Sequence, residues 1–298
     1  MSLTQTDERR GELRSTGTAT TSTPQNLMVF VLSMALFGLS NIILEVIPDI
    51  TIGPVDFSVS YFVFVPITLA ALVNPFWVAL GAPLGEIVFT DLLMGDFSGL
   101  AEVEGFIQMF LAIYIAGSLI RNPLSRIQVI VGSLLVVGID KFLSATVDLA
   151  KVWIGVEDAE YVQGLPESVL FLESIGFVVD LLMSGILFGA IPALWLVPAL
   201  YRKIEPMLGM QPRVPGRKIA GSAPKTVWFV VVAALAGIGS FFFAFFEAWD
   251  VSIGAVEGDF REQFGDQFLW IGVGAVVLVL AIASILFAVW RRRKQRDR

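Results

Sequence analysis

Apolar residues fill most of this chain in long runs, and short polar stretches between them hold most of the charge. The hydrocarbon core of a bilayer is about 30 Å thick, so a helix needs about 20 predominantly apolar residues to cross it. The runs therefore predict an all-α polytopic membrane protein with eight spans. The predicted spans cover residues 27 to 47, 58 to 73, 76 to 94, 105 to 120, 127 to 150, 167 to 200, 226 to 247 and 268 to 290.

Basic and acidic residues lie on opposite sides of the predicted membrane. With a cytoplasmic N-terminus, the inside segments hold 17 of the 20 Lys and Arg residues, of which six belong to the final RRRKQRDR. The outside loops are acidic, and Arg261 is their only basic residue. This asymmetry follows the positive-inside rule and predicts a plasma-membrane protein with both termini cytoplasmic. A chain with seven spans would place RRRKQRDR outside.

The runs and the charge divide the chain into five parts. The first 26 residues lack the pattern of a cleaved signal peptide, so we expect a cytoplasmic tail there. The basic segment 201–225 separates two groups of spans. It either marks topology or contacts anionic lipid headgroups or a cytoplasmic partner. The predicted organisation is a polar tail (1–26), a six-helix membrane core (27–200), a basic cytoplasmic linker (201–225), a transmembrane hairpin (226–290) and a basic cytoplasmic tail (291–298).

Composition excludes much familiar chemistry. Hydrophobic residues make up 56% of the chain and charged residues 16%, which is too apolar for a soluble domain. The chain has no cysteine and no histidine, so disulfides, thiolate nucleophiles, and zinc or haem sites built on these residues are excluded. The net charge of −7 separates into outer acid and inner base, so nucleic-acid binding gains no support. We expect a binding protein without a cofactor rather than an enzyme.

Charged residues inside the predicted spans indicate a site. Two polar stripes at helical spacing lie on the fifth and sixth spans: Lys141, Ser144, Asp148 and Lys151 on one, and Glu173, Gly176, Asp180 and Ser184 on the other. Adjacent antiparallel helices would bring these stripes together. Counting depth at 1.5 Å per residue predicts that Lys141 pairs with Asp180 near the middle of the membrane.

The predicted substrate-binding site lies in the outer half of the core. An ionised group at the bilayer centre costs about 2.5 to 3.5 kcal/mol, so such groups must be paired, protonated or hydrated. Seven acids, Asp140 among them, exceed the two lysines, so either some carboxyl groups are neutral or the solute is cationic or amino-bearing. Internal salt bridges that fix helix register are the alternative. The candidate substrate-binding residues are Glu45, Glu86, Asp91, Lys141, Asp148, Glu173 and Asp180.

Residues 62 to 97, FVFVPITLAALVNPFWVALGAPLGEIVFTDLLMGDF, resemble the second and third helices of the integral membrane S components of energy-coupling factor transporters. The matching features are the turn at Asn74-Pro75, the small residues Gly81 and Gly85, and the ending Asp91-Leu92-Leu93. In GAPLGE, the Gly81 and Gly85 spacing by itself is typical of close helix packing. The resemblance implies a six-helix subunit that captures a small micronutrient from outside, with a transmembrane T subunit and cytoplasmic ATPases as partners. The first span lacks the AxxxA pair associated with T-subunit docking, and the last two spans exceed the family's usual six.

Two other functions fit the pattern. A non-transporting membrane scaffold would use the same bundle and recruit membrane partners through the hairpin and basic tails. A secondary transporter would use the intramembrane acids to couple solute movement to protons or sodium. The importer predicts a bound small molecule, the scaffold predicts membrane-protein partners, and the secondary transporter predicts uptake without ATP.

Overall fold

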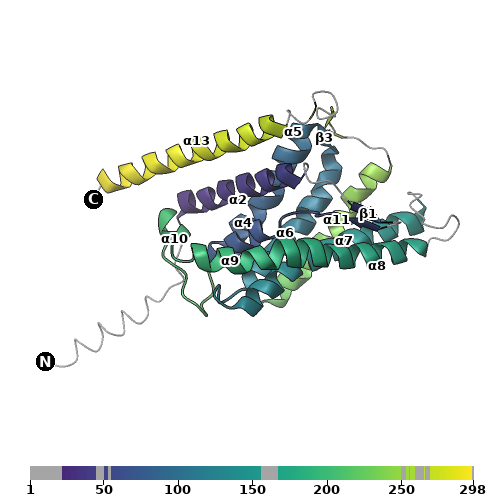
Figure 1. Cartoon of the computed structure of the whole chain (residues 1–298), viewed down its shortest axis with the longest axis horizontal. Coiled ribbons are helices and arrows are strands. Elements are labelled where there is room, and N and C mark those ends of the chain that lie inside the picture. The colour runs from purple at the N-terminus through teal and green to yellow at the C-terminus, as the bar shows by residue number, and fades with distance from the viewer. Residues whose placement is uncertain are drawn as a thin grey trace.

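The computed structural model describes residues 22–44, 50–52, 55–155, 167–249, 253–254, 256–258, 265 and 269–296. Seven segments within them form helices that are long and apolar enough to cross a membrane (Figure 1). They are α2 (Thr23–Leu44), α4 with η1 and α5 (Pro75–Met94), η2 with α6 (Gly99–Leu119), α7 (Arg126–Ile154), α8 with η3 and α9 (Ser168–Leu200), α11 (Val227–Ala248) and α13 (Leu269–Arg296).

The predicted second span differs from the others. Its helix, α3 (Phe64–Leu72), has only nine residues. Residues 58–63, SVSYFV, precede it without helical structure, since serine and β-branched valine are weak helix formers. The helix ends before Asn74, whose side chain accepts a hydrogen bond from the backbone of Phe76 at 3.1 Å and caps α4. Pro75 occupies the first position of α4, where its missing N–H costs nothing, so the turn predicted at Asn74-Pro75 is confirmed.

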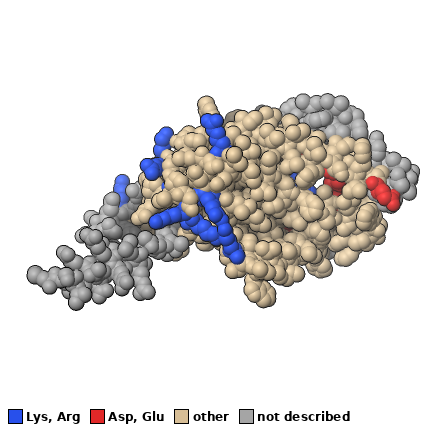
Figure 2. All heavy atoms as spheres, turned by 90° about the horizontal axis from the view of Figure 1, so that it is seen from below, with Lys and Arg blue, Asp and Glu red and all other residues tan. Residues whose placement is uncertain are grey.

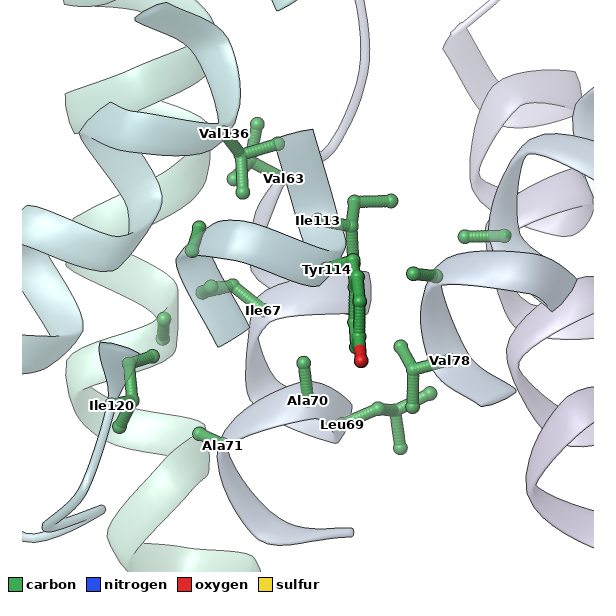
Figure 3. Packing of buried hydrophobic residues seen from close by; sticks show 14 of the residues in the cluster. Val63, Ile67, Leu69, Ala70, Ala71, Val78, Ile113, Tyr114, Ile120 and Val136 are labelled. Atoms are coloured by element: carbon green, nitrogen blue, oxygen red, sulfur yellow. The ribbon is translucent and has the colours of Figure 1, made fainter. Parts of the chain in front are cut away.

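The short helix α3 lies in the centre of the hydrophobic core. Ile67, Ala70 and Ala71 of α3 are fully buried, and α4, α6, α7 and α9 pack around them. Figure 3 shows this packing, with Ile113 from α6 and Val136 from α7 facing the helix. Nearly every side chain of α3 is buried because other helices surround it on all sides.

The glycines of GAPLGE let α4 approach α2 closely. A Cβ atom at Gly81 would lie 2.4 Å from the carbonyl oxygen of Phe30, and one at Gly85 would lie 2.0 Å from that of Met34. Ser33 of α2 also donates a hydrogen bond to the carbonyl oxygen of Val78 at 2.9 Å. Helix packing, the default interpretation of this glycine spacing, is confirmed.

Charge is separated between the two ends of the bundle. Figure 2 shows Lys and Arg side chains gathered at one end and acidic side chains at the other. At the basic end, Asn26 accepts a hydrogen bond from Asn74 at 3.3 Å, and the Gly216 backbone donates to the Arg121 carbonyl at 3.1 Å. At the acidic end, a short antiparallel ladder joins β3 (Asp96–Phe97) to β4 (Val256–Glu257). Another joins β1 (Ile50–Ile52) to β2 (Val55–Phe57).

The last two long helices do not pack together as a hairpin. Helix α11 packs on α6 and α7, whereas α13 packs on α2 and η1 (Ile87–Asp91). They lie on different sides of the molecule (Figure 1). Gly272 of α13 lies against Ile42 of α2 and Met94 of α5. The sequence indicates two consecutive spans but not the helices against which each one packs. The two helices of the expected hairpin pack on different neighbours.

Candidate functional site

Asp180 is shared by two partners in the interior of the bundle. Its Oδ2 lies 3.8 Å from the Nζ of Lys141, so the predicted pair between the fifth and sixth spans is confirmed. Its Oδ1 accepts a hydrogen bond from the hydroxyl of Ser60 at 2.5 Å. The backbone N–H of Ser60 donates in turn to the hydroxyl of buried Ser184 at 3.0 Å. Segment 58–63 is therefore tied to α8, η3 (Leu181–Ala190) and α7.

Tyr61 and Asp140 form a second pair beside the first. The Tyr61 hydroxyl donates to Oδ2 of Asp140 at 2.7 Å, and both side chains are buried. The ammonium group of Lys141 lies 5.6 Å from the centroid of the Tyr61 ring, within the range of a cation–π contact. Ser60, Tyr61, Asp140, Lys141, Asp180 and Ser184 together are called the central polar cluster below.

Glu86 extends the cluster toward α4. It is the last residue of α4 (Pro75–Glu86), and it interacts electrostatically with Asp91, Asp140 and Lys141. Three carboxyl groups, those of Glu86, Asp140 and Asp180, thus face one ammonium group among the described residues. Such an excess of acid in a low-dielectric interior favours a bound cation, a hydrogen-bond donor or carboxyl protonation.

Two π-helical segments flank the acids. The π-helix η1 starts directly after Glu86 and ends at Asp91, and η3 starts directly after Asp180. Pro83 lies inside α4 and removes one backbone donor just before η1. Wider π turns release carbonyl groups from regular bonding and occur often at functional sites. Both π-helices therefore begin where the helix presents a carboxyl group to the cluster.

Other predicted site residues lie farther from the centre. Asp148 and Glu173 occupy the outer halves of α7 and α8, each seven residues from the Lys141–Asp180 pair, or about 10 Å along the helix axis. Glu45 lies outside the described residues. The structure thus brings Glu86, Lys141 and Asp180 together, while Asp91 interacts with Glu86. Asp148 and Glu173 lie toward the acidic end. Over the described part of the chain, no group of three His, Cys, Asp or Glu side chains is arranged to hold a metal ion.

Four members of the cluster were not among the candidate binding residues, although one of them, Ser184, lay on the predicted polar stripe. Asp140 is one of the seven intramembrane acids, but the helical spacing that starts at Lys141 does not include it. In the structure the buried face of α7 runs through Val136, Asp140, Val147 and Lys151, while Lys141 lies at its edge. Ser60 and Tyr61 lay in a segment treated as a regular span. A tyrosine in an apolar run is the signal, because a buried hydroxyl needs a partner.

A second polar contact lies at the basic end. The guanidinium group of Arg213 is buried and donates from Nη1 to the Ala71 carbonyl and from Nη2 to the Ile120 carbonyl. The Tyr201 hydroxyl donates to the Arg213 carbonyl at 2.8 Å. The linker therefore packs against the bundle through Arg213.

Seven long apolar helices, charge-separated ends and a polar cluster between helices define a multi-pass membrane protein. The chain belongs to a family of unknown function, DUF8171, whose model matches residues 28–297. No curated protein and no solved structure matches it.

Proposed function

We propose that the protein crosses the membrane eight times, with both termini in the cytoplasm. The seven long helices supply seven crossings, and residues 58–72 supply the other in a partly non-helical form. Nine helical residues cover about 13 Å and six non-helical residues at most about 20 Å, which together can reach across the hydrocarbon core of about 30 Å. Non-helical backbone is tolerated at that depth where protein surrounds it, and Tyr61, Phe62 and Val63 are all buried.

Contacts at the two ends support this path. Segment 58–72 runs from β2, which contacts α8, to Ala71, which is held by Arg213 at the basic end. Because successive crossings run in opposite directions, the first residues of α2 and the last residues of α13 then lie at the same, basic end of the bundle. Phe287 near the end of α13 lies close to Gly209 of the linker. The positive-inside rule makes that basic end cytoplasmic.

We propose further that the protein is the substrate-binding membrane subunit of an importer of the energy-coupling factor type. The observation that carries the proposal is the sharing of Asp180 between Lys141 and Ser60, beside the buried Tyr61–Asp140 pair. Four elements converge there, and each contributes a polar group that mere helix packing does not require. The excess of carboxyl groups suits a small micronutrient that carries an amino or other cationic group.

The resemblance of residues 62 to 97 to S components points in the same direction. Helices α2 to α9 form the central body, while α11 and α13 lie at its periphery. On this proposal a transmembrane T subunit and cytoplasmic ATPases supply the energy, and the peripheral helices contact lipid.

A membrane scaffold is the second candidate, and the outward faces of α11 and α13 favour it. Trp228 and Leu235 of α11 and Ile285 and Leu286 of α13 are all strongly exposed. Exposed apolar faces on two different sides would let one chain bind two membrane partners. Lipid covers such faces equally well, so we rank solute binding first on the support of the central polar cluster.

The test is purification in mild detergent from the native host, followed by mass spectrometry of bound small molecules and proteins. The importer predicts a stoichiometric solute that is lost from the Glu86→Gln Asp180→Asn variant. Glu167→Gln, which changes an exposed acid at the start of α8, should keep it. Recovery of membrane proteins without any solute, from wild type and variants alike, would favour the scaffold.

A further inference from the structure

Arg213 caps the C-terminal ends of two helices at the basic end. The Ala71 carbonyl in the last turn of α3 lacks its usual partner, because the residue four positions on is Pro75 and has no N–H. Ile120 follows the last residue of α6 (Glu102–Leu119), and its carbonyl is equally without a helical donor. One guanidinium group satisfies both carbonyls, and its positive charge suits the negative ends of both helix dipoles.

The segment that carries Arg213 closes the basic end of the bundle. Residues 204–213, the plug segment, begin with the short helix α10 (Ile204–Met207). Leu208 is 5% exposed and belongs to the main hydrophobic core, whereas its neighbour Met207 is 71% exposed. Gln25 of α2 donates to the carbonyl of Gly209. The plug segment is therefore held at Gln25, Leu208 and Arg213.

Glu205 is buried in this plug segment without a hydrogen-bond partner. Its side chain is 1% exposed, and neither carboxylate oxygen meets a donor in the described part of the chain. The Nε of Arg213 is likewise buried without an acceptor there. Burial lowers the pKa of Arg213 to about 10, while the Glu205 charge opposes that shift, so the guanidinium stays protonated at neutral pH. A buried carboxylate beside a cation that it does not pair with is costly.

We propose that Arg213 is a two-position latch. In the closed position seen here, the guanidinium binds the carbonyls of α3 and α6 and leaves Glu205 unsatisfied. In the open position it releases both carbonyls, pairs with Glu205, and the plug segment lifts from the basic end. The two arrangements exchange two carbonyl hydrogen bonds for one ion pair. This inference does not depend on solute binding.

The absence of native cysteine makes the opening measurable. The reporter is Leu208→Cys, which is shielded while the plug segment is closed, and the matched control is Met207→Cys, which is exposed throughout. The measured quantity is the rate of maleimide labelling of the purified full chain in detergent. Adding Arg213→Gln should raise the Leu208→Cys rate at least tenfold and leave the Met207→Cys rate unchanged.

Glu205→Gln distinguishes a latch from a permanent cap. It replaces the ion pair of the open state by a weaker, neutral hydrogen bond and removes the buried charge of the closed state. The latch therefore predicts labelling several-fold slower than in the parent. A permanent cap, in which Glu205 only attracts Arg213, predicts unchanged or faster labelling, and either result overturns the proposal. If Arg213→Gln does not fold, the direction of the Glu205→Gln effect still decides. Arg213→Lys should label at an intermediate rate, because an ammonium group lacks the planar fork that reaches both carbonyls.

Discussion

The Tyr61 hydroxyl donates to Asp140 at 2.7 Å across the interior, joining the non-helical segment before α3 to the middle of α7. We expect Tyr61→Phe to destabilise the fold by about 1–3 kcal/mol, because it leaves a buried carboxyl group without its partner. The measurement is reversible unfolding in mixed detergent micelles.

Tyr114→Phe is the matched control for this substitution. Tyr114 is also buried and its ring stacks on Phe110, but its hydroxyl makes no hydrogen bond to a described residue. A small change in both variants would mean that the Tyr61–Asp140 bond contributes little to stability.

Lys141 and Asp180 should be energetically coupled. Lys141→Met leaves the half-buried Asp180 with its hydrogen bond from Ser60 but without its cation, and an uncompensated charge away from water is destabilising. We expect Lys141→Met to lower the free energy of unfolding more than the Lys141→Met Asp180→Asn double variant does, with a coupling of about 1 kcal/mol. Lys203→Met, at an exposed lysine of the linker, should be neutral. Additive effects would contradict a coupled pair.

Gly85 should not tolerate a side chain. Its Cβ would lie 2.0 Å from the carbonyl oxygen of Met34, so Gly85→Ala must separate α4 from α2 and should cost about 1–3 kcal/mol. Gly176→Ala is the matched control, because nothing lies within 4 Å of a Cβ there. That change should stabilise α8 by about 0.5–1 kcal/mol, the usual gain of alanine over glycine inside a helix. Equal melting temperatures for the two variants would show that the close approach is not required.

The sequence predicted the long helices and the Lys141–Asp180 pair because these depend on local quantities. Hydropathy and length mark a spanning helix, and helical spacing places side chains on a face. It did not predict which face of α7 points inward, since that depends on neighbours, and Asp140 was therefore left out of the site. The contacts of Arg213 with Ala71 and Ile120 join residues 142 and 93 positions apart. No periodic pattern in the sequence indicates such a contact, so the sequence predicts only a topology signal, or contact with lipid or a cytoplasmic partner, for the basic segment 201–225.

The eight-crossing topology can be tested with single cysteines in this cysteine-free chain. Thr226→Cys lies at the basic end, Ile253→Cys in a turn at the acidic end, and Arg293→Cys near the end of α13, and all three positions are exposed. In intact cells a membrane-impermeant maleimide should label Ile253→Cys, whereas Thr226→Cys and Arg293→Cys should react only after permeabilisation. If residues 58–72 entered and left the membrane on the same side, the chain would cross seven times. The N-terminus would then lie on the opposite side of the membrane from Thr226 and Arg293. A cysteine replacing Thr23, the exposed first residue of α2, then decides. Labelling it from outside while Thr226→Cys stays protected would reject eight crossings.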